Sequence, residues 1–415
     1  MVVKLKDGSQ HLYDVSTIDE ITFQQKQDAA ATSERTVLVY MAAENNLSSY
    51  ADDDLNEMAA GSQQLSEGQT LLAFVDKQGS TLPQIVRLAG GEKTVVKQYA
   101  EDFYSSDPQR MHDVLLWVQQ NYPASDYGLV LWGHASGWTV STDTIAAARR
   151  AYGVDYGTGG GRRWMNITQL AKAMKGLKPF RYILTDCCAM MCIENAYELR
   201  STTEYLIGSP AEIPGNGAPY DLLTKHLFST SQSFYKDIVD TYYDYYTDYY
   251  NDPQNLKYSN TKHMKGYSVP LAAVNTTRLD ALGEATAEAL ATFAKSCPEE
   301  ISTDNCPFYF STNNGQAVMY DMMAVMKHNA QEDVYNQWEQ AFRQAVTYSR
   351  YSAKWTSIYN NVIGQFDNTE DEKGGCVSFF VPKAAYNNCE EQYNSRCSNF
   401  AWYNYANWSL YGWQE

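Results

Sequence analysis

Short apolar stretches alternate with amphipathic ones from residue 36 to about residue 225, and this alternation predicts an α/β core. The apolar stretches have the length of strands and lie at residues 36–43, 70–76, 126–133, 181–187 and 204–209. Between them, segments such as 55–65 and 111–122 place apolar residues at helical spacing. Strands that are apolar on both faces are typical of parallel sheets covered by helices on each side. The pattern therefore predicts a three-layer α/β/α sandwich with a mainly parallel central sheet.

The two ends of the chain have different patterns. Residues 1–25 alternate like paired strands around a turn at Asp7-Gly8, which predicts a short N-terminal β-hairpin, and residues 26–35 form a polar linker. After about residue 225 the chain becomes rich in tyrosine, and seven of the 17 residues in 234–250 are tyrosines. We interpret that segment as a helix-packing surface. Residues 226–415 are therefore predicted to form a helix-rich, tyrosine-rich C-terminal domain docked on the core.

Composition excludes several classes of protein. The chain has 415 residues, of which 44% are hydrophobic and 20% charged, so it can bury a core. Its net charge of -17 argues against a nucleic-acid or anionic-membrane surface, because both require basic patches. It contains no apolar run long enough to span a membrane. Since a strand-like segment follows Met1 directly, we expect the chain to start at or after a processing point.

Candidate chemistry gathers at the ends of two predicted strands. His134 follows the strand-like run 126–133, and Cys187 and Cys188 stand at the end of the run 181–187. A cysteine becomes a nucleophile when a nearby imidazole stabilises its thiolate. The carboxyl ends of parallel strands share one crevice, where both groups could meet. Alone, this pattern does not distinguish Cys187 from Cys188, and it also fits a structural histidine and packed cysteines.

The other cysteines give no metal-site pattern. Cys192 lies close to the pair, and the rest are far downstream: Cys297, Cys306, Cys376, Cys389 and Cys397. No CxxC pair occurs, which argues against a zinc ribbon or a thioredoxin-type site. In an exported protein the downstream group could form one or two disulfides, and unpaired buried cysteines are an equally good interpretation.

Several segments resemble the clostripain-like cysteine peptidases of the caspase-like clan. LVLWGHASGW (129–138) resembles their histidine motif, and TDCCAMMCIENAYEL (185–199) resembles their Asp-Ala-Cys-Leu-Met segment. Residues 36–58 resemble the first strand and helix of the family, and residues 208–221 its Pro-Gly-x-Gly loop. The motifs follow one another in the family's order. The resemblance implies a caspase-like fold and a cysteine endopeptidase that acts through a thioester.

The resemblance also assigns roles to individual residues. It aligns Cys187 with an alanine and Cys188 with the catalytic cysteine, and it makes His134 the general base of a Cys-His dyad. Backbone N–H groups of Ala135 and Cys188 would then hold the oxyanion. Ala135 stands where relatives have glycine, and alanine tolerates positive φ poorly. We therefore expect a slightly different oxyanion loop that still supports catalysis.

Specificity follows from the resemblance as well. The family cuts after Arg or Lys, so we expect protein or peptide substrates with a basic residue before the scissile bond. Asp186 matches the family's aspartate, and Glu212 is the carboxylate available in the Pro-Gly loop, either as a pocket residue or as an ordinary loop charge. The glycine-rich stretch 140–163 lies where relatives cut themselves into two chains. Arg149 and Arg150 are the expected self-cleavage sites in an otherwise monomeric protein.

Cofactor, location and an alternative function complete the prediction. The chemistry requires no cofactor and the sequence predicts no metal ligands, but calcium could bind, and Asp52-Asp53-Asp54 is either an ion site or a solvated helix start.

LKDGS and YDVSTIDEITF resemble the N-terminal segment of many exported proteins of gut Bacteroidetes. We therefore expect a secreted, periplasmic or lipid-anchored protein. The alternative is a catalytically degenerate surface protein that uses the caspase-like core as a binding scaffold.

Overall fold

The computed structural model describes residues 2–4, 10–12, 33–79, 81–138, 152–157, 161–257, 261–262, 264–296, 300–311, 317–356, 363–365, 374–386 and 393–411. The chain divides into two compact units, Met1–Ala31 and Thr32–Glu415. In the first unit, β1 (Val2–Lys4) and β2 (Gln10–Leu12) pair antiparallel. The second unit contains all the other helices and strands described.

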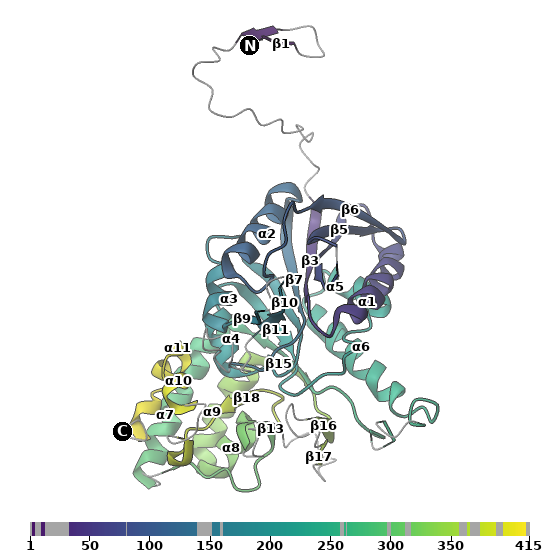
Figure 1. The fold of residues 1–415 in the computed structure, drawn as a ribbon. Helices are drawn as coiled ribbons and strands as arrows, with labels where there is room; N and C mark the ends of the chain where they lie inside the picture. The colour runs from purple at the N-terminus through teal and green to yellow at the C-terminus, as the bar shows by residue number, and fades with distance from the viewer. Residues whose placement is uncertain are drawn as a thin grey trace. The chain divides into compact units, whose positions relative to one another are not determined.

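A nine-stranded sheet forms the centre of the second unit (Figure 1). Its strands are β3 (Ser33–Ala43), β4 (Gln69–Lys77), β5 (Gln84–Ala89), β6 (Glu92–Gln98), β7 (Ala124–Trp132), β10 (Phe180–Asp186), β11 (Thr203–Gly208), β12 (Leu271–Asn275) and β15 (Val346–Arg350). They lie in the order β15-β12-β11-β10-β7-β3-β4-β5-β6. Strands β4, β3, β7, β10 and β11 run parallel, and these are the five apolar runs recognised in the sequence. The outer strands pair antiparallel, so the sheet is mixed but largely parallel.

Helices cover both faces of this sheet (Figure 1). One face packs against α1 (Ser48–Gly61), α5 (Tyr220–Leu227) and α6 (Phe234–Tyr249). The other packs against α2 (Pro108–Asn121), α3 (Ile167–Ala173), α4 (Ile193–Leu199) and α7 (Leu279–Ser296). Alternate residues of β3 belong to opposite cores, since Leu38 faces the second group of helices and Val39 the first. The predicted α/β fold with helices on both faces of a largely parallel sheet is thus present.

The chain beyond residue 225 shares the central sheet. Strands β12 and β15 extend it past β11, and the tyrosine-rich helix α6 covers one face, with Tyr242 and Tyr246 buried there. We expected residues 226–415 to form a domain docked on the core. The short apolar run Leu271–Asn275 satisfies the free edge of β11 instead, and too few residues form it for periodicity to distinguish it from a helical segment.

A smaller assembly completes the fold next to α4. A three-stranded sheet joins β13 (Phe308–Ser311), β14 (Ala317–Asp321) and β18 (Ser378–Phe380). Around it lie α8 (Met322–Asn329), α9 (Glu332–Ala345), α10 (Tyr393–Cys397) and α11 (Ala401–Tyr405). The backbone N–H of Phe380 donates to the buried carboxylate of Glu194, 2.7 Å away, and thereby ties β18 to α4. The C-terminal half therefore supports the segment that follows Cys188.

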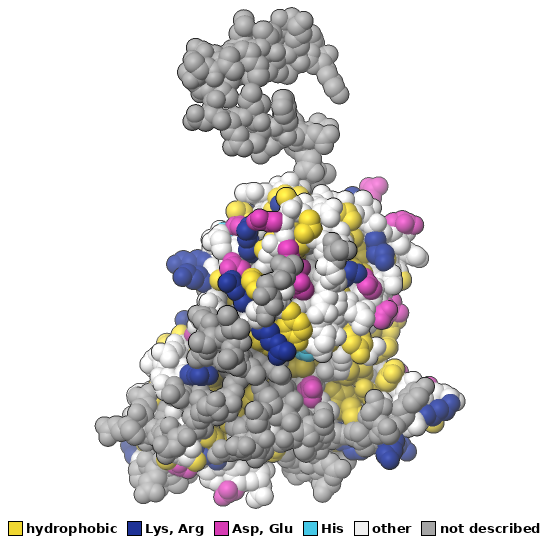
Figure 2. Space-filling model, viewed as in Figure 1, with side chains coloured by type: hydrophobic (Ala, Val, Ile, Leu, Met, Phe, Trp, Pro, Cys, Tyr) yellow, Lys and Arg dark blue, Asp and Glu magenta, His cyan; other side chains and the backbone are white. Residues whose placement is uncertain are grey.

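The described surface carries charges of both signs. In the described part of the face shown in Figure 2, basic and acidic side chains are interspersed and do not gather into one basic patch. Among the described helices, none combines the length and the hydrophobicity that a bilayer span requires.

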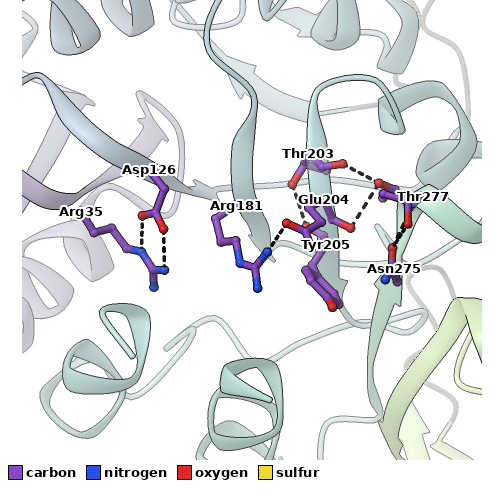
Figure 3. A network of polar contacts seen from close by, with 9 residues as sticks. Arg35, Asp126, Arg181, Thr203, Glu204, Tyr205, Asn275 and Thr277 are labelled. Atoms are coloured by element: carbon purple, nitrogen blue, oxygen red, sulfur yellow. Dashed lines mark hydrogen bonds and ion pairs between the residues drawn. The ribbon is translucent and has the colours of Figure 1, made fainter. Parts of the chain in front are cut away.

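Ion pairs hold the sheet at the amino ends of its parallel strands (Figure 3). Arg35 on β3 makes two contacts with Asp126 on β7, at 2.5 and 2.9 Å. Arg181 on β10 pairs with Glu204 on β11. These pairs join neighbouring strands at the edge opposite the candidate site, so we assign them a structural role.

Candidate active site

His134 and Cys188 stand at the carboxyl ends of neighbouring parallel strands. Trp132, the last residue of β7, pairs in register with Asp186, the last residue of β10. His134 and Cys188 each follow two residues later, and both side chains are partly exposed. The N–H of Gly133 also donates to the Asp186 carbonyl, at 3.4 Å, which continues the strand pairing toward the site. The register thus brings the predicted base and nucleophile to the same edge of the sheet.

His134 is held by contacts to its imidazole and to its backbone. Its Nε2 lies 2.8 Å from Oδ1 of Asn46, in the loop after β3, and its carbonyl accepts the N–H of Gly153 at 2.8 Å. An amide oxygen can only accept, so Nε2 carries the proton and Nδ1 is the basic nitrogen. Sequence reasoning did not select Asn46. The only signal was its position directly after the first strand of the core.

A strained turn projects Cys188 from the end of β10. Ala189, the next residue, has a φ of 56°, a conformation that costs a non-glycine residue energy and that is concentrated at functional sites. The turn is held because the N–H of Ala189 donates to Ala211, at 2.8 Å, and that of Met191 to Ser209, at 2.9 Å. Sγ of Cys188 lies 3.4 Å from the N–H nitrogen of Ile213. The thiol therefore faces the loop that follows β11.

The neighbouring cysteines are placed very differently. Cys187 is fully buried, and its thiol donates to the carbonyl of Leu131 at 2.9 Å. Cys192 is also fully buried, and burial raises the pKa of both thiols well above the ordinary value. A buried neutral thiol is a poor nucleophile. The geometry consequently favours Cys188.

The described downstream cysteines are unpaired. Cys306, Cys376 and Cys397 are buried and free. Cys297 and Cys389 lie outside the described residues. Of the two interpretations that the sequence left open, the described cysteines follow the one without disulfides.

Ala135 does not adopt the positive φ that alanine tolerates poorly. It is absent from the described non-glycine residues with positive φ, and it forms an isolated antiparallel bridge with Tyr152. Gly137, two residues later, does have a φ of +68°. Alanine at position 135 is therefore unstrained, and it retains the N–H group that an oxyanion site needs.

Asp186 lies beneath the site and is only 3% exposed. Its carboxylate accepts hydrogen bonds from the Ala218 N–H at 3.0 Å, the Tyr220 hydroxyl at 2.9 Å and the Tyr242 hydroxyl at 2.7 Å. Burial raises its pKa, whereas these three donors lower it. Gly217 is required beside it, because a Cβ there would lie 2.7 Å from the carboxylate and its φ is +64°. Tyrosines of the C-terminal half thus enclose the predicted substrate-binding aspartate.

Glu212 lies in the loop next to Ile213 and is partly exposed. Its N–H donates to the carbonyl of Thr356 at 3.3 Å, and its carbonyl accepts from the Tyr267 hydroxyl at 3.2 Å. Backbone contacts therefore fix Glu212 next to Ile213, whose N–H nitrogen lies 3.4 Å from the Cys188 thiol. The predicted self-cleavage residues, at 149–150, lie outside the described residues.

The predicted aspartate run does not form an ion site. Asp52 pairs with Lys77 at 2.5 Å, Asp53 is exposed, and Asp54 is buried and accepts the Trp132 indole N–H at 2.5 Å. They diverge because consecutive residues of helix α1 point in different directions. A different cluster could hold a metal ion. It consists of Glu44, Asp76 and Asp102.

A partly exposed thiol and an oriented imidazole at the ends of adjacent parallel strands are typical of a cysteine hydrolase. The sequence pattern of the Clostripain family, peptidases C11, matches residues 39–413. The chain therefore belongs to the clostripain family and is a cysteine peptidase. The resemblance found in the sequence is confirmed, and peptides are the substrates of this class.

Solved structures support the same assignment. A secreted C11 cysteine protease from Bacteroides thetaiotaomicron, in complex with an irreversible peptide inhibitor, is 28% identical and superposes with a TM-score of 0.75. The similarity covers 91% of this chain and 99% of that one. An inactive zymogen C11 protease from Parabacteroides distasonis shares the fold at 24% identity and a TM-score of 0.71, covering 91% of this chain and 99% of that one. A search of curated proteins gave no match.

Proposed function

We propose that this peptidase cleaves peptide bonds after Arg or Lys through a Cys188–His134 dyad. The strand register that brings the two residues to one edge carries the proposal. The burial of Cys187 and Cys192 supports Cys188 as the nucleophile, since the adjacent thiols are inaccessible.

The mechanism follows from the hydrogen bonds around the imidazole. With its Nε2 proton donated to Asn46, His134 uses Nδ1 to take the proton of the Cys188 thiol. Sγ then attacks the scissile carbonyl, while the N–H groups of Ala135 and Cys188 stabilise the oxyanion. His134 returns the proton to the leaving amine, and a thioester remains on Sγ. Water activated by the same nitrogen hydrolyses this thioester.

No cofactor takes part in these steps. The proton moves between Sγ, Nδ1 and the leaving amine, and the oxyanion is held by backbone donors. A bound calcium ion would therefore act on the fold around the site and not on the reacting atoms.

Basic specificity rests on the carboxylates around the site. Glu212 is partly exposed in the loop that contacts Sγ, so it is our first candidate to pair with a substrate cation. Asp186 is enclosed by its three donors, and we assign it a longer-range electrostatic role below the pocket. The net charge of -17 would also attract cationic segments of substrate.

We further propose activation by self-cleavage within residues 140–163, after Arg149 or Arg150. Residues 139–151, which contain both arginines, join Trp138 to Tyr152, and neither of these two residues belongs to the nine-stranded sheet, so a cut between them leaves that sheet intact. The likeness to an inactive zymogen and to a secreted protease favours an exported precursor. The product would be a single protomer of two chains.

Two single substitutions test the nucleophile. Cys188→Ala should abolish turnover of a fluorogenic Arg or Lys amide, whereas Cys187→Ala should keep it, because the Cys187 thiol is fully buried and donates to the Leu131 carbonyl. Covalent labelling by a peptide electrophile with a basic residue should follow the same order. A wild-type protein that neither turns over nor becomes labelled would support the binding-scaffold alternative.

A further inference from the structure

A buried tyrosine from the C-terminal half reaches the loop that faces the Cys188 thiol. Tyr267 is 1% exposed, and its hydroxyl donates to the carbonyl of Glu212 at 3.2 Å. This carbonyl and the N–H of Ile213 belong to the same peptide unit. The N–H nitrogen of Ile213 in turn lies 3.4 Å from Sγ of Cys188. A single peptide unit therefore links the tyrosine hydroxyl to the thiol.

The planarity of that peptide unit couples the two contacts. In a trans peptide the C=O and N–H groups lie in one plane and point in opposite directions, so a contact that fixes the oxygen also fixes the direction of the N–H. A donor to the oxygen also polarises the unit and strengthens the hydrogen bond that its N–H donates. A hydrogen bond to the ionised form of a group favours that form. The N–H of Ile213 thus stabilises a thiolate on Cys188 more than it stabilises the neutral thiol.

A second contact holds the other side of the same loop. The N–H of Glu212 donates to the carbonyl of Thr356 at 3.3 Å, in an isolated antiparallel bridge. Thr356 is the last residue of β16 (Lys354–Thr356). In an extended segment the N–H groups of successive residues point to opposite sides. The bridge to Thr356 therefore leaves the N–H of Ile213 directed toward the thiol.

Tyr267 is itself held in place. Its N–H donates to the carbonyl of Met264 at 2.8 Å, which closes a turn. Its ring meets the ring of Tyr250 edge to face, with 5.1 Å between the centroids. Burial is the main cause that raises the pKa of Tyr267 well above its ordinary value. The hydroxyl consequently keeps its proton, and remains a donor, over the pH range in which a cysteine thiol titrates.

We propose that Tyr267 is a positioning residue for the nucleophile, acting through the Glu212–Ile213 peptide to stabilise the Cys188 thiolate. The role rests on the proposed function, because it requires Cys188 to be the nucleophile. It differs from the role of His134, which takes the thiol proton. The effect of Tyr267 passes through the peptide unit, so it needs no contact with the reacting atoms. The C-terminal half would then contribute to the reactivity of the site as well as to its support.

The pH dependence of alkylation tests this role, because it reports the thiolate directly. Tyr267→Phe keeps the ring and removes the hydroxyl. Both proteins are treated with iodoacetamide, a small uncharged reagent that reacts with thiolates, from about pH 5 to 9. Peptide mapping by mass spectrometry measures modification at Cys188 alone. Both proteins keep the same titratable groups on the segments around the thiol: His134, Asp186, Cys187 and Glu212.

The midpoint of the alkylation curve should move to higher pH in Tyr267→Phe, by about 0.5 to 1 unit. Below the midpoint, labelling should slow about 3- to 10-fold, since the thiolate fraction falls tenfold for each unit. Tyr182→Phe is a matched control, because Tyr182 is also fully buried and its hydroxyl donates to the carbonyl of Leu227 at 2.8 Å. It should lower the melting temperature by a similar amount and keep the wild-type midpoint.

Two results would overturn the positioning role while leaving the proposed function intact, provided that wild type turns over the Arg amide and Cys188→Ala does not. They are a Tyr267→Phe midpoint within about 0.2 unit of wild type, or an equal displacement in Tyr182→Phe. Turnover that persists in Cys188→Ala would instead overturn the proposed function and this role together.

Discussion

Removing the Asn46 side chain tests how His134 is oriented. In Asn46→Ala, the imidazole Nε2–H loses an acceptor 2.8 Å away. The imidazole is charged while it holds the Cys188 proton, and a hydrogen bond to a charged group contributes about 1.5 to 3 kcal/mol. If that contribution is lost in the transition state, kcat falls about 10- to 150-fold while KM changes little. Asn46 is exposed, so stability should change by no more than about 0.5 kcal/mol.

The assay is hydrolysis of a fluorogenic Arg amide, with the active enzyme counted by a covalent peptide electrophile. Asn56→Ala is a matched control, because Asn56 is also exposed and accepts a hydrogen bond from Lys93 at 2.6 Å. It should retain wild-type kcat. Asn46→Gln should recover part of the loss if its longer amide reaches Nε2. A kcat for Asn46→Ala within about twofold of wild type would refute the orienting role.

Other perturbations act on the support of the site. Burial raises the pKa of Glu194 from 4.5 to about 7, so the stability that its protonated form contributes is lost as pH rises from 4.5 through 7. Glu194→Gln should therefore be more stable than wild type at pH 8, by up to about 3 kcal/mol in urea unfolding. Equal stability of the two proteins at pH 8 would contradict this. Gly217→Ala should lower the melting temperature and kcat, because its Cβ would lie 2.7 Å from the Asp186 carboxylate; wild-type values for both would count against the tight contact. Replacing both arginines at 149–150 by glutamine should stop maturation seen by mass spectrometry, and cleavage that persists in Cys188→Ala would rule out self-processing.

Much of the fold could be predicted because its parallel strands have a strong local signal. Residues 37–43 and 129–132 are hydrophobic at every position, which a helix exposed on one side does not tolerate. Strands β12 and β15 were missed because each is short and partly built from alanine, tyrosine or polar residues. Their position depends on the free edge of β11, which is a property of the sheet and not of their own sequence.

The residues of the candidate site likewise divide into those with a local sequence signal and those without one. His134 and Cys188 could be selected because each directly follows an apolar strand, and a motif distinguished Cys188 from Cys187. Asn46 lacks such a signal, since any polar residue suits a loop. The aspartate run 52–54 was a candidate ion site because its charges are consecutive in sequence, but consecutive residues of a helix point in different directions.

The sequence by itself determined which segments become buried parallel strands and which residues stand at their ends. It could do so because burial follows from the hydrophobic pattern of neighbouring residues. Tertiary structure decided what surrounds those ends. Tyr242 reaches Asp186 from a helix far along the chain, and the acids Glu44 and Asp76 meet only because β3 and β4 are adjacent in register. Contacts between distant segments depend on sheet order and strand register, and neither of these has a local signature in the chain.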